Sequence, residues 1–174
     1  MAHVIFAQEM FFPLQSTQVL SAYLKKAGHT TDVAIGSPSE IVKYCKKEKS
    51  DLIAFSVLTS YRNHMLATVD ELKEANIDSI LIAGGYDITF MPQILKNSNL
   101  DIICVGEGGD PLIELCKSLD KGKNWRDLEI GNLHIKQKDG SVKKNPMRHW
   151  LMNMDETPFD DRDIYMKKDS YFKI

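Results

Sequence analysis

Hydrophobic positions along the chain fall into short runs separated by longer amphipathic stretches, and the most continuous run covers residues 51–59. It reads DLIAFSVLT, a pattern typical of a strand that is covered by helices on both faces in the middle of a parallel sheet. Its polar residues Ser56 and Thr59, with the following Ser60, gather at the carboxyl end. Open α/β sheets bind their ligands at that end. The run therefore predicts both the centre of the core and the edge of a binding site.

The alternation of strand-like and helix-like patterns extends from the amino terminus to Gly122. Strands are predicted at residues 3–8, 29–35, 51–59, 79–83 and 101–105, and helices at residues 14–26, 39–48, 63–76, 92–96 and 111–119. Gly28 is the expected end of the first helix, and Ser39 the expected N-cap of the second. This alternation favours right-handed crossovers. The predicted fold is α/β, with a flavodoxin-like (Rossmann-like), doubly wound five-stranded parallel sheet.

Beyond Gly122 the pattern changes. Residues 132–137 and 142–144 flank Asp139-Gly140, and Asp-Gly supplies the positive φ of a tight turn, so a small β-hairpin is expected. Residues 152–174 are polar, without the periodicity of an element that has its own core, and predict a linker lying on a surface. The sequence is thus divided into two parts, an α/β domain (1–122) and a hairpin with a linker (123–174).

Charge and cysteine content narrow the function classes. The formal net charge is −2, with no large block of one sign, which argues against nucleic acid as a partner. No window approaches the roughly 20 apolar residues of a membrane-spanning helix, and the amino terminus lacks the basic region of a signal peptide. Cys45, Cys104 and Cys116 fit neither a zinc site nor a disulfide framework. These features predict a soluble cytoplasmic protein.

Glycines follow two of the predicted strands, as Gly84-Gly85 and as Gly106-Glu107-Gly108. Glycines at carboxyl ends let a ligand approach the backbone, and the hydroxyls nearby offer oriented hydrogen bonds. The alternative is that these glycines only make strand-to-helix turns. The glycine-rich fingerprints of dinucleotide and nucleoside-triphosphate sites are absent from the sequence.

These residues resemble the cobalamin-binding domains of methionine synthase and the mutases, whose motif runs D-x-H-x-x-G, then S-x-L, then GG. Ser56-Val57-Leu58 matches the S-x-L, and Gly84-Gly85 matches the GG at a slightly shorter spacing. At the position of the first element the sequence reads EMFFPL, from Glu9 to Leu14. Phe11 therefore stands where the family has the histidine that ligates cobalt.

A cobalamin-binding domain without this histidine is similar to the amino-terminal domain of cobalamin-dependent radical SAM enzymes. The phrases that carry this likeness are KAGH (26–29), DLIAFS (51–56), AGGYDITFMP (83–92), DIICVGEG (101–108) and MDETPFDDR (154–162). Two departures stand out. The family often has a histidine where Asp87 stands, and the CxxxCxxC that begins soon after a stretch such as residues 171–174 is missing. The resemblance implies a fragment or a stand-alone carrier, served by a radical SAM domain in cis or in trans.

The resemblance also implies roles for individual residues. The corrin would lie over the sheet edge in the base-off state, with Ser56 bonding the dimethylbenzimidazole of the tail and Gly84 and Gly85 making room for it. Phe11 and Phe12 would pack near the lower corrin face, or would only form a lip over the sheet. The implied cofactor-binding positions are Glu9, Phe11, Phe12, Ser56, Val57, Leu58, Thr59, Tyr61, Gly84, Gly85, Tyr86, Thr89, Gly106, Glu107 and Gly108.

Further side chains near these positions are open to two interpretations. Tyr61, Arg62 and Tyr86 would contact corrin amides, or are surface residues of their loops. His64 is expected to face solvent rather than cobalt. No catalytic residue and no metal ligand is predicted, and the iron–sulfur cluster and S-adenosylmethionine would belong to the missing domain. The competing hypothesis is a ligand-sensing or protein-interaction domain of the same fold that binds no corrinoid.

Overall fold

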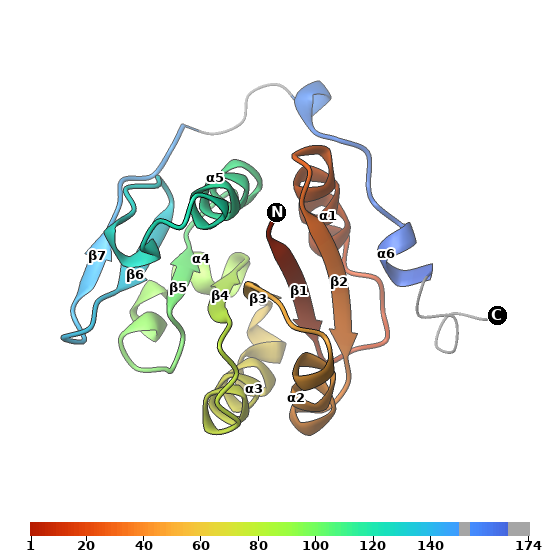
Figure 1. Ribbon diagram of the computed structural model, residues 1–174, viewed down its shortest axis with the longest axis horizontal. Helices are drawn as coiled ribbons and strands as arrows, with labels where there is room; N and C mark the ends of the chain where they lie inside the picture. The colour runs from red at the N-terminus through yellow and green to blue at the C-terminus, as the bar shows by residue number, and fades with distance from the viewer. Residues whose placement is uncertain (150–153, 167–174) are drawn as a thin grey trace.

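A mixed β-sheet runs through the middle of the molecule and carries helices on both faces (Figure 1). The computed structural model describes residues 1–149 and 154–166, and within them the sheet has seven strands in the order β2-β1-β3-β4-β5-β6-β7. The strands are β1 His3–Gln8, β2 Thr30–Ile35, β3 Leu52–Ser56, β4 Ile80–Gly84, β5 Ile102–Cys104, β6 Leu133–Lys136 and β7 Val142–Lys144. The α-helices are α1 Gln15–Lys26, α2 Pro38–Lys47, α3 Arg62–Glu74, α4 Tyr86–Phe90, α5 Gly109–Asp120 and α6 Asp163–Met166. The 3-10 helices are Thr59–Tyr61, Pro92–Leu95, Trp125–Asp127 and Met154–Glu156.

The first five strands are parallel, and their order, β2-β1-β3-β4-β5, confirms the predicted flavodoxin-like arrangement. The apolar run that includes β3 lies at the centre of this parallel part, between β1 and β4. In the register of β3 and β4, Ser56 is the partner of Gly84. The carboxyl ends of β3 and β4 therefore meet at one edge of the sheet.

The predicted hairpin forms, and it extends the main sheet. β6 pairs with β5 in antiparallel register, with Ile103 opposite His134, and β7 pairs with β6. Gly140, in the turn between them, has φ 81°, in agreement with the expected need for positive φ. The sheet is therefore mixed, because an antiparallel pair continues the parallel strands beyond β5.

Two helical layers cover the sheet, with α1 and α5 on one face and α2 and α3 on the other (Figure 1). Alternate residues of β3 divide between them, as expected for a strand with two buried faces. Leu52 and Ala54 belong to the cluster under α1 and α5, whereas Ile53 and Phe55 belong to the cluster under α2 and α3. By the same alternation Ser56 faces the layer of α1 and α5.

The ends of the helices follow local capping rules. Gly28, with φ 89°, comes directly after the C-cap Ala27 of α1, as predicted. The prediction for α2 is wrong by two residues, because Ser37, not Ser39, is the N-cap. The Ser37 side chain accepts a hydrogen bond from the Glu40 amide, and the Glu40 carboxylate accepts one from the Ser37 amide at 2.8 Å. This reciprocal capping box fixes the start of the helix.

The segment after β4 contains a helix that the sequence analysis missed. The prediction placed a helix at residues 92–96, where the structure has a 3-10 helix, Pro92–Leu95. A short α-helix, α4, precedes it and begins immediately after Gly85. Ile88 of α4 is fully buried under the layer of α2 and α3, which anchors this turn to the core.

The C-terminal segment, residues 154–166, lies along α1 and the outer strand β2 (Figure 1). This segment belongs to the stretch predicted as a linker lying on a surface, and two of its side chains are buried. Ile164 and Tyr165 are 1% and 2% exposed. Within the described residues no helix has the length and apolarity that a membrane span requires. Residues 150–153 and 167–174 lie outside the described residues, and they include the remainder of the predicted linker and the stretch 171–174.

Candidate functional site

The residues predicted to bind a cofactor come from the ends of four strands, and the topology brings these ends to one edge of the sheet. The β1–α1 loop carries Glu9, Phe11 and Phe12, and the segment after β3 carries positions 57–61. Gly84 ends β4, and residues 106–108 connect β5 to α5. Sequence positions that are far apart therefore become neighbours at the edge where α/β sheets bind ligands.

A strip of small residues marks this edge under α1 and α5. Ser56 lies beside Gly84 in the sheet, and its Oγ is 2.8 Å from the Oγ of Ser16 on α1. A methyl group added at Gly84 would lie 3.5 Å from Cβ of Cys104, an ordinary contact distance. The strip continues at Gly108, where an added Cβ would be 3.4 Å from Leu20 of α1. Ser56 and Gly84 thus present a hydroxyl and an open backbone to the same side of the sheet.

Gly85 has a different structural role from Gly84. Its φ is 100°, and a Cβ there would lie 2.8 Å from the carbonyl oxygen of Val57 and 2.9 Å from its nitrogen. The Val57 amide donates to the Gly84 carbonyl at 2.8 Å, and the Asp87 amide donates to the Val57 carbonyl at 3.2 Å. Gly85 therefore lets the loops after β3 and β4 pack backbone against backbone.

An ion pair between Arg62 and Asp87 joins α3 and α4, the helices that follow these two loops. Arg62 Nε donates to Oδ2 of Asp87 at 2.7 Å, and its Nη2 donates to Oδ1. The Asp87 side chain is only 1% exposed, whereas that of Arg62 is 30% exposed. Hydrogen bonds from Arg62, together with one from the Thr59 side chain, lower the pKa of Asp87 although burial opposes this. Asp87 and Arg62 thus fix the start of α3 against α4, a role that the sequence analysis left open for Asp87.

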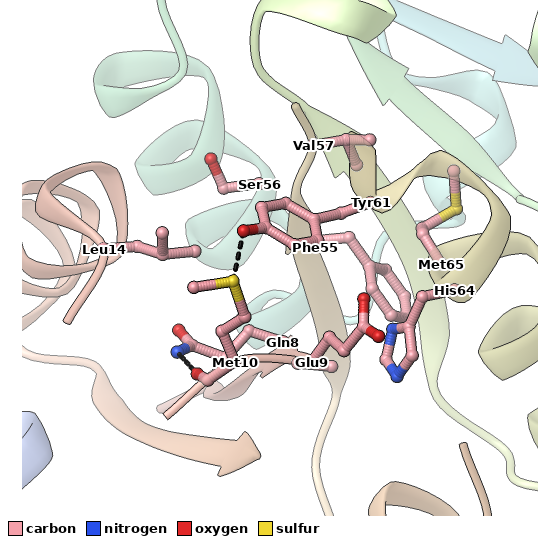
Figure 2. A pocket seen from close by; sticks show the side chains of 11 residues that line it. Gln8, Glu9, Met10, Leu14, Phe55, Ser56, Val57, Tyr61, His64 and Met65 are labelled. Carbon is pink, nitrogen blue, oxygen red and sulfur yellow. Dashed lines mark hydrogen bonds between the residues drawn. The ribbon is translucent and has the colours of Figure 1, made fainter. Parts of the chain in front are cut away.

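A pocket opens between the ends of β1 and β3 and the start of α3 (Figure 2). Its lining includes four predicted positions, Glu9, Ser56, Val57 and Tyr61. The other lining residues were not among the predicted cofactor-binding positions. They are Ala7, Gln8, Met10, Leu14, Phe55, His64 and Met65. Gln8 and Met10 flank Glu9 in the sequence, so their position at the end of β1 was the signal that could have identified them.

Figure 2 shows Met10 and Tyr61 pointing toward one another across this pocket, and the Tyr61 hydroxyl donates to the Met10 sulfur. His64 does not face solvent as expected. It is half-buried, and its Nε2 donates to the Gly36 carbonyl at 2.9 Å, since a carbonyl can only accept. His64 therefore ties α3 to the end of β2 and contributes to the wall of the pocket.

Gln8 and Tyr165 hold the β1–α1 loop. The Gln8 amide nitrogen donates to the carbonyls of Met10 and Phe12, the latter at 2.9 Å. Its amide oxygen accepts from the Tyr165 hydroxyl at 2.5 Å, and that hydroxyl accepts from the Leu14 amide at 3.1 Å. A side chain of the C-terminal segment thus takes part in fixing the first loop of the site.

The surface around the pocket is apolar and exposed. Phe11, Phe12 and Leu58 are 49%, 61% and 45% exposed, and Tyr86 is 74% exposed. The further exposed apolar side chains of the same loops are Met10, Phe90 and Met91. Exposed apolar side chains on the loops after β1 and β3 and on α4 suit contact with an apolar ligand or partner at the edge where α/β sheets bind ligands.

The remaining predicted positions lie beside β5. The Thr89 hydroxyl accepts from the Gly106 amide at 3.0 Å, and the Glu107 carbonyl accepts from the Asn132 side chain at 2.8 Å. Gly106 has φ 85°. These contacts hold the turn between β5 and α5 against α4 and the segment before β6, so the turn contributes shape to the edge.

The three cysteines are buried and form no disulfide. Burial raises the pKa of the Cys45 thiol to about 11 and those of Cys104 and Cys116 to about 12. Thiols with such pKa values stay protonated at neutral pH and bind metals poorly. In residues 1–149 and 154–166, no group of three or more histidine, cysteine, aspartate or glutamate side chains is arranged to hold a metal ion.

The family model of the B12 binding domain matches residues 13–116 of the chain. The chain is 28% identical over 129 residues to an uncharacterized methyltransferase of Pyrococcus horikoshii, covering 72% of this chain and 27% of that protein. It is 27% identical over 153 residues to the anaerobic magnesium-protoporphyrin IX monomethyl ester cyclase of Rubrivivax gelatinosus, covering 83% of this chain and 26% of that protein. The chain therefore spans about a quarter of the length of these relatives.

Among solved structures, the cobalamin-dependent S-adenosylmethionine radical enzyme OxsB, with aqua-cobalamin and S-adenosylmethionine bound, superposes with a TM-score of 0.79. The match covers 98% of this chain and 25% of the OxsB chain, at 22% sequence identity. At this identity the likeness establishes a shared fold, which includes the C-terminal segment as well as the α/β part.

Proposed function

The chain belongs to the B12 binding domain family, and from this premise we propose that the carboxyl edge of its sheet binds cobalamin. The predicted resemblance to cobalamin-binding domains is thereby confirmed at the level of the family. One observation carries the proposal for this chain. Ser56 and Gly84, at the positions of the S-x-L and GG motifs, are paired in adjacent strands and open toward α1 and α5.

The strip of small residues suits the nucleotide tail of the cofactor. Ser56 would exchange its bond with Ser16 for one to the dimethylbenzimidazole, and Gly84 would leave room because a side chain there would fill the space beside Cys104. A tail held in this strip would be detached from cobalt, which is the base-off state. Gly85 would act indirectly, by keeping the loops after β3 and β4 in contact.

The exposed apolar loops suit the corrin ring. Phe11 and Phe12 would lie against its lower face, and Leu58 and Tyr86 would extend the contact. Phe11 offers cobalt no nitrogen ligand, and the Nε2 of His64 donates to the Gly36 carbonyl, which leaves only Nδ1 of that ring with a lone pair. We propose that cobalt is held without a histidine from the position of Phe11. Burial of these side chains under the ring would contribute through the hydrophobic effect, about 25 cal/mol per Å² of apolar surface covered.

The carrier role rests on the relatives. When bound, the corrinoid would supply a cobalt centre for methyl transfer, in keeping with the name of the Pyrococcus horikoshii relative. We propose that the chain presents this cofactor to a radical SAM domain in cis or in trans, which would hold the iron–sulfur cluster and S-adenosylmethionine. Residues 1–122 would carry the cofactor, and residues 123–174 would lead toward that partner. The free, buried cysteines suit a reducing cytoplasm as the compartment.

Retention of hydroxocobalamin tests the proposal. Purified protein is incubated with hydroxocobalamin and passed over a sizing column, and the visible spectrum of the protein peak is recorded. We expect co-elution with the spectrum of the base-off form. Gly84→Leu should lower retention by at least about tenfold, because the new side chain occupies the tail strip at a position with ordinary backbone angles.

The matched control is Lys49→Leu, which adds the same side chain at an exposed position before β3, at the opposite edge of the sheet. It should retain cobalamin like the wild type. Loss of retention in neither variant would contradict the assignment of the tail strip. No retention by the wild type would favour the alternative, a ligand-sensing or interaction domain without a corrinoid.

A further inference from the structure

The described chain makes a contact between its two ends that the cofactor proposal does not require. Tyr165, in α6, reaches the β1–α1 loop through Gln8 and the Leu14 amide. We propose that Tyr165 is a positioning residue, and that docking of the C-terminal segment sets the conformation of the loop that faces the corrin. The inference rests on the proposed function, because it concerns access and affinity at the same site.

The backbone of the loop is held by Gln8 at Met10 and Phe12 and by Tyr165 at Leu14, and the Met10 sulfur accepts from Tyr61. Phe11 and Phe12 are exposed, so their side chains are not anchored in the core. The Met10 and Phe12 carbonyls both accept from Gln8, which is itself 7% exposed at the end of β1. Without these bonds, the loop would lose two of the contacts that fix its backbone. Gln8 thus fixes the backbone of the loop at Met10 and at Phe12.

Only an amide side chain can serve all these contacts from position 8. Gln8 uses its nitrogen as the donor to two carbonyls and its oxygen as the acceptor for Tyr165. The Tyr165 hydroxyl fixes which way the amide points, because reversing it would place the NH₂ against a donor. Burial raises the pKa of Tyr165, so the hydroxyl stays protonated and able to donate.

The C-terminal segment is anchored independently of this hydroxyl. Ile164 is 1% exposed and packs in the cluster under α1 and α5. Asp161 accepts from the Ser21 hydroxyl and pairs with Lys25 of α1, with 10% of its side chain exposed. Removal of the Tyr165 hydroxyl should therefore leave the segment docked, which separates positioning from folding.

The test is Tyr165→Phe, with Tyr44→Phe as the matched control. Tyr44 also donates from a partly buried phenol to a side chain, Asp32, on the other face of the sheet. Hydrogen exchange of residues 9–14 is measured without cofactor, and hydroxocobalamin affinity is measured by titration. We expect Tyr165→Phe to speed exchange of these residues by about fivefold and to weaken affinity by about threefold to tenfold, because it removes the hydrogen bonds of the hydroxyl to Gln8 and to the Leu14 amide. Tyr44→Phe should change neither.

A second variant keeps the result interpretable if Tyr165→Phe is unstable. Gln8→Met keeps the side-chain length and removes the bonds of Gln8 to the Met10 and Phe12 carbonyls and to Tyr165, so it should change exchange and affinity in the same direction as Tyr165→Phe. The double variant should lose less than the sum of the two single losses, because both changes remove the bond between Gln8 and Tyr165. Additive losses would show two independent roles and would overturn the inference.

The outcomes separate this inference from the proposed function. Unchanged exchange, or faster exchange with unchanged affinity, overturns the inference while cobalamin binding stands. Absence of binding by the wild type overturns both the proposed function and the role assigned to Tyr165. Faster exchange together with weaker binding supports the inference.

Discussion

The two halves of the sheet edge are held in different ways. Over β3 and β4, the loops are fixed by neighbours, through the Arg62–Asp87 ion pair and the backbone contact at Gly85. Over β1, the loop depends on Gln8 and on Tyr165, which is 157 positions away. One half is complete once its own loops have folded, whereas the other needs the C-terminal segment.

This difference indicates which half of the edge depends on a distant segment for its conformation. The β3–β4 half would bind the tail in a strip whose shape is built in advance. The β1 half would face the corrin with a loop whose conformation depends on contacts with Tyr165 of the C-terminal segment. Any partner that moves residues 154–166 would therefore alter the corrin face first.

The largest expected effect on stability is at Gly85, in the β3–β4 half. Gly85→Ala places a Cβ against the Val57 backbone at a positive φ, which should lower the free energy of unfolding by roughly 4 kcal/mol. Gly84→Ala is the control, because its Cβ meets Cys104 at an ordinary distance. Urea denaturation compares the two variants. Equal midpoints would show that the backbone contact at Gly85 is dispensable.

A smaller effect on stability is expected from a change in the C-terminal segment, on which the loop of the β1 half depends. Ile164→Ala removes a buried side chain and should cost roughly 3 kcal/mol at most sites of this kind. It should also raise hydrogen exchange in residues 9–14 while leaving residues 57–62 protected, because the ion pair does not involve the C-terminal segment. Met166→Ala, two positions further along α6 and exposed, is the control. Loss of protection in both loops alike would contradict the division into two halves.

The smallest effect is a pH dependence confined to the ion pair. The pKa of Asp87 is lowered in the folded state, so the pair stabilises the fold above the ordinary carboxyl pKa, near 4, and loses this contribution as pH falls through the folded value. Wild type and Arg62→Met should differ by about 5 °C in Tm at neutral pH, and the gap should narrow in acid below pH 4. A gap that stays constant with pH would mean that charge does not hold these loops together.

Periodicity was sufficient to predict most of the fold. The buried run containing β3 and the alternating helices predicted the parallel strand order, because burial on both faces leaves a mark at every residue. No comparable sequence pattern indicated which strand of the sheet the hairpin would pair with. Its pairing of β6 with β5 is a tertiary choice among sheet edges. At α2, Ser37 and Ser39 both suit an N-cap, and Glu40 decided for Ser37 through the capping box.

The sequence predicted which strand ends come together at the site, but not every contact that its residues make there. Ser56 and Gly84 come together as expected because strand register carries them. Whether Gly85 opens space or lets backbones touch depends on a loop that is not adjacent in sequence. The bond between Gln8 and Tyr165 joins a strand end to a polar segment without periodicity, and no local pattern encodes it.

The remote contact of Tyr165 also imposes an order on synthesis. Ribosomes add roughly 5–20 residues per second, and domains fold as they emerge, so Tyr165 follows the end of β5 by roughly 3–12 s. During that interval a nascent chain has its parallel sheet and its ion-paired loops, while Gln8 still lacks the hydroxyl that orients its amide. On the role proposed for Tyr165, loading of the cofactor becomes efficient only after residues 154–166 have been synthesised and docked.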